Sequence, residues 1–221
     1  MPIWKMINFQ NRASPAIEHL NFLHDHNIII IIFITLTVII IISISFSNSF
    51  FNRFFSENQE IEYFWTSIPA FLLIFLAFPS IKILYITEEY FSPSLTIKVI
   101  GHQWYWSYEY TDLKNVSFDS FLRNSSYIRL LETSNHLILP YKSSIRTLIT
   151  SEDVIHSWAI PALGVKVDAV PGRINQLILN LNRAGIFSGQ CSEICGANHR
   201  FMPITISSIS PNKFIRSIKI I

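Results

Sequence analysis

Two long stretches near the start of the chain lack charged residues, whereas apolar and polar positions alternate over much of the rest. No charged residue occurs within residues 27–52 or 63–81, and the second stretch stays apolar past Lys82 as far as residue 86. A helix of ~20 apolar residues spans the ~30 Å hydrocarbon core of a membrane. We therefore predict two transmembrane helices over about residues 27–47 and 63–86.

Two other interpretations of these apolar stretches are less consistent with the pattern. Helices buried in a soluble protein are rarely apolar on every face over such a length. A cleavable signal peptide has a shorter apolar region, and no small-x-small site follows the first stretch. Pro69 and Pro79 fall within the second stretch; a membrane helix tolerates proline where neighbouring helices satisfy the freed carbonyl groups. The short polar segment between the stretches predicts an antiparallel hairpin.

After Pro93 the pattern changes to short segments rich in β-branched and aromatic residues. Four examples are "LTIKVIG" at 95–101, "SIRTLIT" at 144–150, "INQLILNL" at 174–181 and "PITISSI" at 203–209, and all six glycines of the chain lie in this half. No helical periodicity of useful length is present. The pattern predicts an all-β domain, a sandwich or Greek-key barrel. The chain then divides into residues 1–93, which carry the hairpin, and a β domain over 94–221.

Composition agrees with a membrane protein. Half of the residues are hydrophobic and mean hydropathy is +0.35. Charged residues make up 14%, against about 25% in an ordinary soluble domain. The formal net charge is only +2. We expect membrane lipid, and no nucleic acid, among the partners of this chain.

One loop, "GQCSEICGANHRFMP" from residue 189, holds Cys191, Cys195, His199 and Met202. The two cysteines could form a strained disulfide, remain structural thiols or bind a metal. A zinc site would have no use for the methionine, whereas thiolate, imidazole and thioether together are copper ligands. Two thiolates could each bridge two copper ions, and each ion would then need an imidazole. His156, in "SEDVIHSWAIP" at the end of a strand-like segment, is the candidate for the second imidazole.

Four stretches give the whole chain a close resemblance to subunit 2 of cytochrome c oxidase. They are "HDH" at 24–26, "GHQWYWSYEYTD" at 101–112, "SEDVIHSWAIPALGVKVDAVPGR" at 151–173 and "GQCSEICGANHRFMPI" at 189–204. The resemblance implies a cupredoxin-like Greek-key domain with a dinuclear copper A centre. It implies bridging by Cys191 and Cys195, and terminal ligation by His156 and His199. Met202 and the backbone carbonyl of Glu193 would be weak axial ligands.

The resemblance also implies a function. The chain would be a non-haem subunit of the terminal respiratory oxidase, accepting electrons from cytochrome c and passing them to the haem-containing catalytic subunit 1. Oxygen would be reduced there to water, coupled to proton pumping. We expect the mitochondrial inner membrane, with the β domain in the intermembrane space and other oxidase subunits as neighbours. His24 and His26 are interpreted as interfacial polar residues without an assigned role.

Three further residues receive roles from the same resemblance. The side chain of Glu193 would bind a magnesium ion shared with the catalytic subunit. Trp104 would be the site where electrons arrive from cytochrome c, and Glu62 would lie at the mouth of a proton-uptake path. From the alternation alone, "WYWSYEY" at 104–110 predicts Trp104, Trp106, Tyr108 and Tyr110 on one face of a strand.

Docking of a basic cytochrome c would require an acidic surface. The carboxylates we nominate are Glu109, Asp112, Asp119, Glu152 and Asp153. Yet residues 95–221 contain 13 Lys and Arg against 8 Asp and Glu, and Leu113, Lys114 and Asn115 stand where relatives carry carboxylates. Local field matters more than net charge for steering. We therefore expect an attraction to cytochrome c that is weaker than is usual for the family.

Three other classes share part of this pattern. Nitrous oxide reductase has the dinuclear site but is soluble and far larger. A quinol oxidase subunit has the hairpin and β domain but lacks the copper ligands. A membrane-tethered copper carrier would need an exposed, exchangeable site and would leave the aromatic run unexplained.

Overall fold

The computed structural model describes residues 6–50, 52–54, 56–89, 92–113, 116–124 and 128–218. The described chain forms two compact units, residues 19–86 and the remainder, so that residues up to Glu18 belong with the β domain. Two residues considered above, Lys114 and Asn115, lie outside the described residues. The division of the chain at residue 93 stays a prediction.

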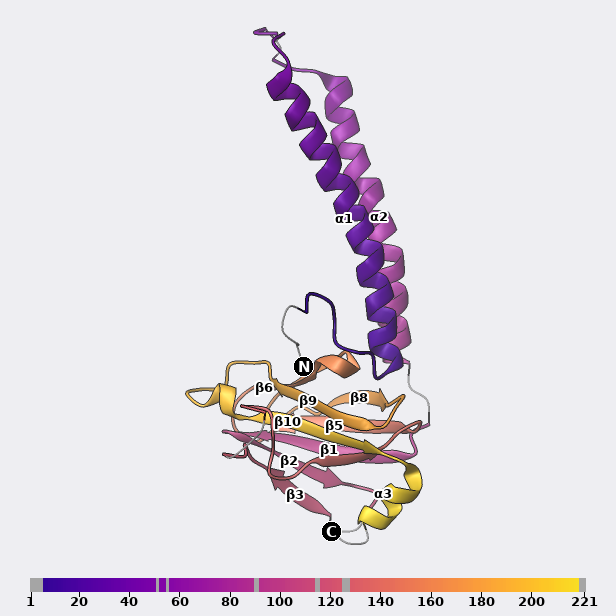
Figure 1. Cartoon of the computed structure of the whole chain (residues 1–221), viewed down its shortest axis with the longest axis vertical. Coiled ribbons are helices and arrows are strands. Elements are labelled where there is room, and N and C mark those ends of the chain that lie inside the picture. The colour runs from indigo at the N-terminus through magenta and orange to yellow at the C-terminus, as the bar shows by residue number, and fades with distance from the viewer. Residues whose placement is uncertain are drawn as a thin grey trace. The chain divides into compact units, whose positions relative to one another are not determined.

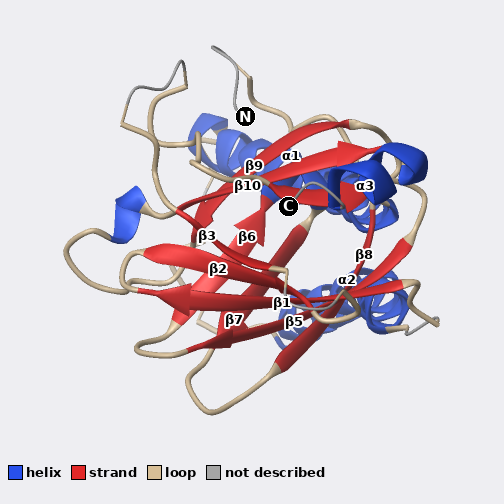
Figure 2. Cartoon of the chain, turned by 90° about the horizontal axis from the view of Figure 1, so that it is seen from below, coloured by secondary structure: helices blue, strands red, loops and turns tan. Residues whose placement is uncertain are grey.

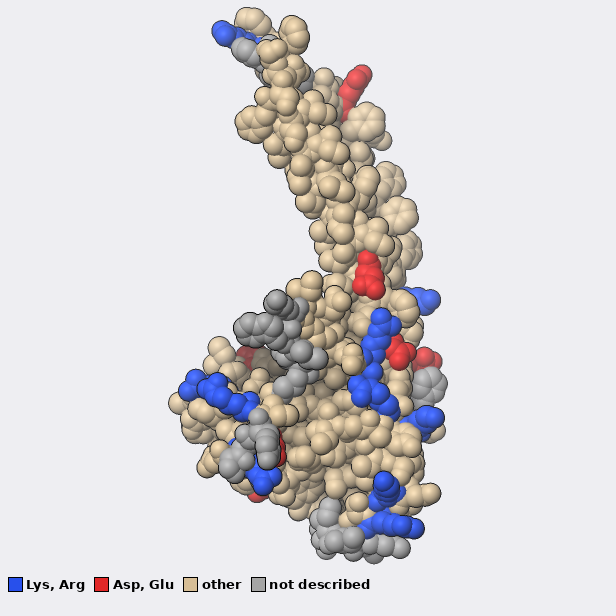
Figure 3. Space-filling model, viewed as in Figure 1, with Lys and Arg blue, Asp and Glu red and all other residues tan. Residues whose placement is uncertain are grey.

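Two long helices, α1 (Pro15–Ser47) and α2 (Gln59–Glu88), form the N-terminal hairpin (Figure 1). Both are long and apolar enough to cross a membrane, and their large apolar side chains are mostly exposed. Charged side chains are sparse along the hairpin in Figure 3. The prediction of two long apolar helices is therefore confirmed. At 33 residues, α1 is ~50 Å long at 1.5 Å per residue. The helices therefore outreach the hydrocarbon core, and the limits of the spans stay predictions.

Helix α2 continues through Pro69 and Pro79. Pro79 has no N–H to donate to the carbonyl oxygen of Phe75, four residues earlier. His26 of α1 lies with its Nε2 atom 3.3 Å from that oxygen. The neighbouring helix thus supplies a donor where the proline removed one, which gives His26 a structural partner that the sequence did not indicate.

Over its described residues, the β domain contains ten strands in two five-stranded sheets (Figure 2). One sheet has the order β3-β2-β1-β5-β8 and the other β4-β10-β9-β6-β7. The strands are β1 (Leu95–His102), β2 (Tyr105–Tyr110), β3 (Ser117–Ser120), β4 (Leu137–Pro140), β5 (Ser144–Ser151), β6 (His156–Ile160), β7 (Val165–Ala169), β8 (Asn175–Asn180), β9 (Gly185–Cys191) and β10 (Pro203–Ile209). Three short helices complete the domain: η1 (Pro161–Leu163), η2 (His199–Phe201) and α3 (Pro211–Ile218).

The core lies between the two sheets because alternate side chains of each strand point inward. From β2 it receives Trp106, Tyr108 and Tyr110, and from β6 it receives Trp158, all buried. The strands β1 and β5 are parallel neighbours, as are β4 and β10, whereas the other strand pairs are antiparallel. The four strand segments predicted from the sequence correspond to β1, β5, β8 and β10, so the all-β domain is confirmed.

Three local expectations were wrong. Trp104 precedes β2 in the β1–β2 turn, because the antiparallel pairing of His102 with Tyr105 leaves two residues to reverse the chain. His156 begins β6 and does not end a strand. A helix, α3, follows β10; its eight residues make about two turns, which is shorter than the stretch over which a helical period can be recognised in a sequence.

The segment before α1 is anchored to the β domain. Ala13 donates its N–H to the carbonyl of Ala162 at 3.1 Å and accepts from Asn182 N–H at 2.9 Å. Gly164 follows η1 with φ +65°, and a Cβ there would lie 2.9 Å from Ile17 Cα. Only glycine meets both the left-handed conformation and the close approach, so this position lets the first turn of α1 pack on the domain.

Candidate metal centre

Strand pairing brings the two ligand-bearing segments together. In the sheet, β6 is an antiparallel neighbour of β9, with Trp158 opposite Cys191. His156 starts β6, and Cys191 ends β9 before the loop that carries the remaining candidates. The loop is closed by two further bonds, from Ser192 N to Ser157 O at 3.0 Å and from Cys191 N to Met202 O at 3.4 Å.

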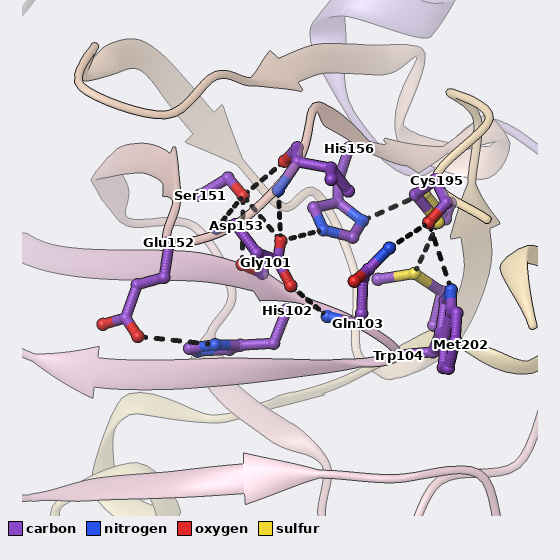
Figure 4. Close-up of polar contacts among 12 residues, drawn as sticks. Gly101, His102, Gln103, Trp104, Ser151, Glu152, Asp153, His156, Cys195 and Met202 are labelled. Atoms are coloured by element: carbon purple, nitrogen blue, oxygen red, sulfur yellow. Dashed lines mark hydrogen bonds and ion pairs between the residues drawn. The ribbon is translucent and has the colours of Figure 1, made fainter.

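All six proposed copper ligands converge on one place. Cys191 Sγ lies 3.9 Å from His156 Nδ1 and 3.4 Å from the carbonyl oxygen of Glu193. Cys195 Sγ lies 3.4 Å from both His199 Nδ1 and Met202 Sδ. The ligand atoms of His156, Cys191 and Cys195 all lie within 4.8 Å of one another. Figure 4 shows His156, Cys195 and Met202 facing this centre. The arrangement supplies two sulfur atoms in the middle with one imidazole beside each.

The chemistry of this donor set fits a bound cation. His156, Cys191, Cys195 and Met202 are buried, and both cysteines are free thiols. Burial disfavours the Cys191 thiolate, but hydrogen bonds with His156 and with the backbone of Ser157 and Glu193 outweigh it, so the pKa of Cys191 is lowered. Burial and then the neighbouring Cys191 raise the pKa of Cys195. A second thiolate beside the first thus resists ionisation, and a metal cation would stabilise both.

Asp153 holds the imidazole of His156 from behind. Its Oδ1 lies 2.8 Å from His156 Nε2, so that Nε2 carries the proton and Nδ1 faces Cys191 with its lone pair. Burial opposes charge on both partners, yet the Cys191 and Asp153 contacts raise the pKa of His156. The bonds from His156, Val154 N and Gln103 N lower the pKa of Asp153. The sequence had suggested Asp153 only as a docking residue.

The β1–β2 turn forms a third wall of the centre. Trp104 is half-buried and donates its indole N–H to the carbonyl oxygen of Cys195 at 3.2 Å. Gln103 donates its side-chain amide to the same oxygen at 2.8 Å. Gly101 leaves room for the imidazole, since a Cβ there would lie 2.8 Å from His156 Cδ2. The sequence pattern around residue 104 gave no signal for these contacts beyond the presence of the aromatic run.

The nominated docking carboxylates separate into two groups. Asp119, Glu152 and Asp153 act through their charge on Tyr105, the residue after Trp104: burial raises the pKa of Tyr105, and these three carboxylates raise it further. Asp153 contacts His156 of the candidate centre, and Glu152 Oε2 is 3.6 Å from His102 Nδ1.

The other two docking candidates lie at the far end of β2. Glu109 is four residues beyond Tyr105, ~13 Å along a strand, and pairs with Lys98 at 3.4 Å. Asp112 follows β2 and accepts the backbone N–H of Thr96 at 2.6 Å. Three of the five carboxylates therefore act on Tyr105, next to Trp104 in the chain, and two lie at the other end of β2.

The remaining site candidates are exposed. The Glu193 side chain is exposed on the ligand loop, although its carbonyl belongs to the centre. Glu62 is exposed in the first turn of α2, in the helical unit.

The fold and site define a class: a chain with two helices long and apolar enough to cross a membrane, whose β sandwich carries a buried cysteine–histidine group that could hold a metal ion. The family described as cytochrome c oxidase subunit II matches with its transmembrane domain over residues 2–83 and with its periplasmic domain over residues 95–209. The chain therefore belongs to the cytochrome c oxidase subunit II family, and its β domain is cupredoxin-like.

Relatives match almost the whole chain. Cytochrome c oxidase subunit 2 of Choristoneura rosaceana is 53% identical over 221 residues, covering 97% of each chain. That of Ctenocephalides felis is 52% identical, covering 98% of this chain and 97% of its own. The crystal structure of the periplasmic domain of cytochrome oxidase subunit II of Bradyrhizobium japonicum is 44% identical, with a TM-score of 0.57. It covers 58% of this chain and 93% of that domain.

Proposed function

We propose that this chain accepts electrons from cytochrome c at a dinuclear copper centre and passes them to the haem-containing catalytic subunit of a terminal oxidase. The enzyme as a whole would be a cytochrome-c oxidase that reduces oxygen to water and translocates protons. The observation that supports this most strongly is the convergence of two thiols, two imidazoles, a thioether and a carbonyl on one buried centre.

Each ligand has a distinct task in the proposal. Cys191 and Cys195 would bridge two copper ions, while His156 and His199 would each bind one of them. Met202 and the carbonyl of Glu193 would bind weakly, in the manner of the axial ligands of copper electron-transfer sites. When bound, the copper pair supplies one-electron oxidation and reduction, with the charge shared between two ions.

The protein's own contribution is to hold the ligands still. His156 is fully buried and fixed by Asp153, and the cysteines are held at the end of β9 and on a loop tied to β6 and Met202. A site that keeps its geometry needs little rearrangement when its charge changes, which favours fast electron transfer. The Trp104 indole, bonded to the Cys195 carbonyl, provides a covalent and hydrogen-bonded route toward the centre.

Docking of cytochrome c would use the acidic group beside Trp104. Asp119, Glu152 and Asp153 act through their charge on Tyr105, and exposed carboxylates can steer a basic partner. Because Asp153 is also engaged with His156, we assign the steering mainly to Asp119 and Glu152. Glu109 and Asp112 remain nominated as outlying members of the acidic surface.

The remaining assignments rest on the resemblance alone. The exposed Glu193 side chain would bind magnesium together with the catalytic subunit, and Glu62 would lie at a proton-uptake path. The hairpin would cross the mitochondrial inner membrane among lipid and other oxidase subunits. The β domain would then face the intermembrane space.

The direct test is copper binding by the full-length chain with Cys191→Ser or Cys195→Ser. A serine hydroxyl is a hard, neutral group and a poor bridge for soft copper, so we expect loss of the mixed-valence electron-spin signal of two coupled coppers. The control is Ser192→Ala in the same loop, which should keep that signal. Two coupled coppers in either serine variant, with normal turnover with cytochrome c, would refute the assignment, and a single-copper signal in the unmodified chain would favour a copper carrier.

A further inference from the structure

Gln103 contacts both halves of the candidate centre (Figure 4). Its backbone N–H donates to Asp153 Oδ2 at 2.6 Å, and the other oxygen of that carboxylate holds His156. Its side-chain amide donates to the carbonyl oxygen of Cys195 at 2.8 Å. A single residue of the β1–β2 turn therefore connects the segment before β6 with the ligand loop after β9.

The ligand loop is shaped to receive this amide. Gly196, next to Cys195, has φ +121°, and a Cβ at that position would lie 3.2 Å from Gln103 Nε2 and 3.1 Å from Trp104 Cζ2. Any side chain at residue 196 would press on both groups that donate to the Cys195 carbonyl. The loop thus leaves space where the amide and the indole approach the backbone.

These bonds join protein groups only. His156 and Cys195 approach the centre from different segments, and their backbones are 39 residues apart along the chain. Three hydrogen bonds fix the separation of His156 and Cys195. They run from His156 to Asp153, from Asp153 to Gln103 and from Gln103 to the Cys195 carbonyl. Ordering ligands before binding reduces the conformational entropy that metal binding must overcome.

We propose that Gln103 is a positioning residue whose side-chain amide sets the place of Cys195 relative to His156 before copper binds. The inference rests on the proposed copper function. It differs from the role given to Trp104, because the amide lies on no route for electrons and acts only through the backbone of the ligand loop. Replacing groups that orient metal ligands typically weakens metal binding by about 10- to 100-fold.

The test compares Gln103→Leu with Gln176→Leu in the full-length chain in detergent. Both variants exchange an exposed glutamine of the β domain for leucine, but Gln176 lies on β8, which carries no ligand. Copper affinity is measured by competition with a chelator, the electron-spin spectrum is recorded with copper bound, and thermal unfolding is followed without copper. We expect Gln103→Leu to bind copper about 10- to 100-fold more weakly with an altered copper hyperfine pattern. Without copper, Gln103→Leu should unfold only a few degrees below Gln176→Leu, since one part-buried hydrogen bond is lost.

Equal copper affinity and an unchanged spectrum in Gln103→Leu and Gln176→Leu would overturn the inference. The inference would also be overturned if Gln103→Leu unfolded at a lower temperature without copper but kept an unchanged electron-spin spectrum with copper bound. That result is expected of a residue that only stabilises the fold. If Gln103→Leu does not fold, Gln103→Asn decides by the same criteria, because it keeps the backbone donor while its amide is one methylene too short. Failure of the unmodified chain and of Gln176→Leu to hold two coppers would instead overturn the proposed function, and this inference with it.

Discussion

Replacing Asp153 by asparagine separates two interpretations of this carboxylate. One is that it steers cytochrome c, and the other is that it supports the metal centre. Its Oδ1 accepts from Val154 N at 2.6 Å and faces His156 Nε2 at 2.8 Å, while Oδ2 accepts from Gln103 N at 2.6 Å. Both oxygens therefore face N–H donors. Whichever way the asparagine amide is turned, its NH₂ group meets a donor and at least one hydrogen bond is lost.

The loss of folding free energy expected in Asp153→Asn follows from the lost hydrogen bond. A hydrogen bond to a charged group contributes about 1.5–3 kcal/mol. The Asp153 side chain is 32% exposed, so water replaces part of the loss and we expect the lower end, about 1.5–2 kcal/mol. For a β domain of this size that corresponds to a fall in the unfolding temperature of roughly 5–10 °C. Because His156 loses its fixed orientation, copper affinity should fall about 10- to 100-fold.

The assay uses Asp153→Asn beside Glu152→Gln, in which a neighbouring carboxylate with a more exposed side chain loses the same charge. Thermal unfolding of the full-length chain without copper, copper competition and the rate of association with cytochrome c at low salt are measured for both. We expect Glu152→Gln to slow association more than Asp153→Asn, since the Glu152 side chain is the more exposed of the two and Asp153 is engaged with His156. Only Asp153→Asn should lose thermal stability and copper affinity.

The reasoning would be refuted if Asp153→Asn unfolded and bound copper like Glu152→Gln and differed from the unmodified chain only in association. Asp153 would then be a docking residue, and the hydrogen bond to His156 would carry no weight in the metal centre.

Three further predictions concern other parts of the molecule. Met202→Leu should retain copper in part but shift the potential of the site, since a thioether binds weakly; an unchanged potential and spectrum would show that Met202 only packs. His26→Phe should destabilise the hairpin by about 0.6–1.7 kcal/mol in detergent denaturation. In a Pro79→Ala background, where the backbone N–H returns, it should have little effect; equal losses in both backgrounds would contradict the pairing. Turnover with cytochrome c should fall only shallowly with ionic strength, because exposed charges are screened within ~8 Å at physiological salt; a steady rise from the lowest salt would indicate a repulsive surface.

Helices and strands could be predicted wherever the hydrophobic pattern of the sequence extends over enough residues. An uncharged run of membrane length marks a helix regardless of tertiary structure, and β5 buries every second residue, which is the period that its sequence shows. Helix α3 has only eight residues, too few for a helical period to be recognised. Trp104 was placed in the strand because alternation alone does not show where a turn interrupts it.

The candidate ligands could be selected from the sequence, whereas the residues that orient them could not. Cys191, Cys195, His199 and Met202 share one loop, and their residue types are those of copper ligands. The orienting bonds join residues far apart in sequence: Gln103 and Asp153 are 50 positions apart, and Gln103 and Cys195 are 92 apart. Glutamine and aspartate are common surface residues, and only the strand pairing shows which of them face the centre.

Three separate segments of the β domain supply the residues of the centre, which explains how a small domain can hold the ligands rigidly. The loop after β9 supplies thiols, imidazole and thioether, β6 supplies His156, and the β1–β2 turn supplies the amide and indole that bind the Cys195 carbonyl. β6 and β9 belong to one sheet, and the β1–β2 turn belongs to the other. Movement of a ligand would therefore disturb hydrogen bonds across both sheets. Because packed sheets do not deform continuously, the ligand positions are set by the fold. Such a site suits a protein that transfers electrons and needs no open position for a substrate.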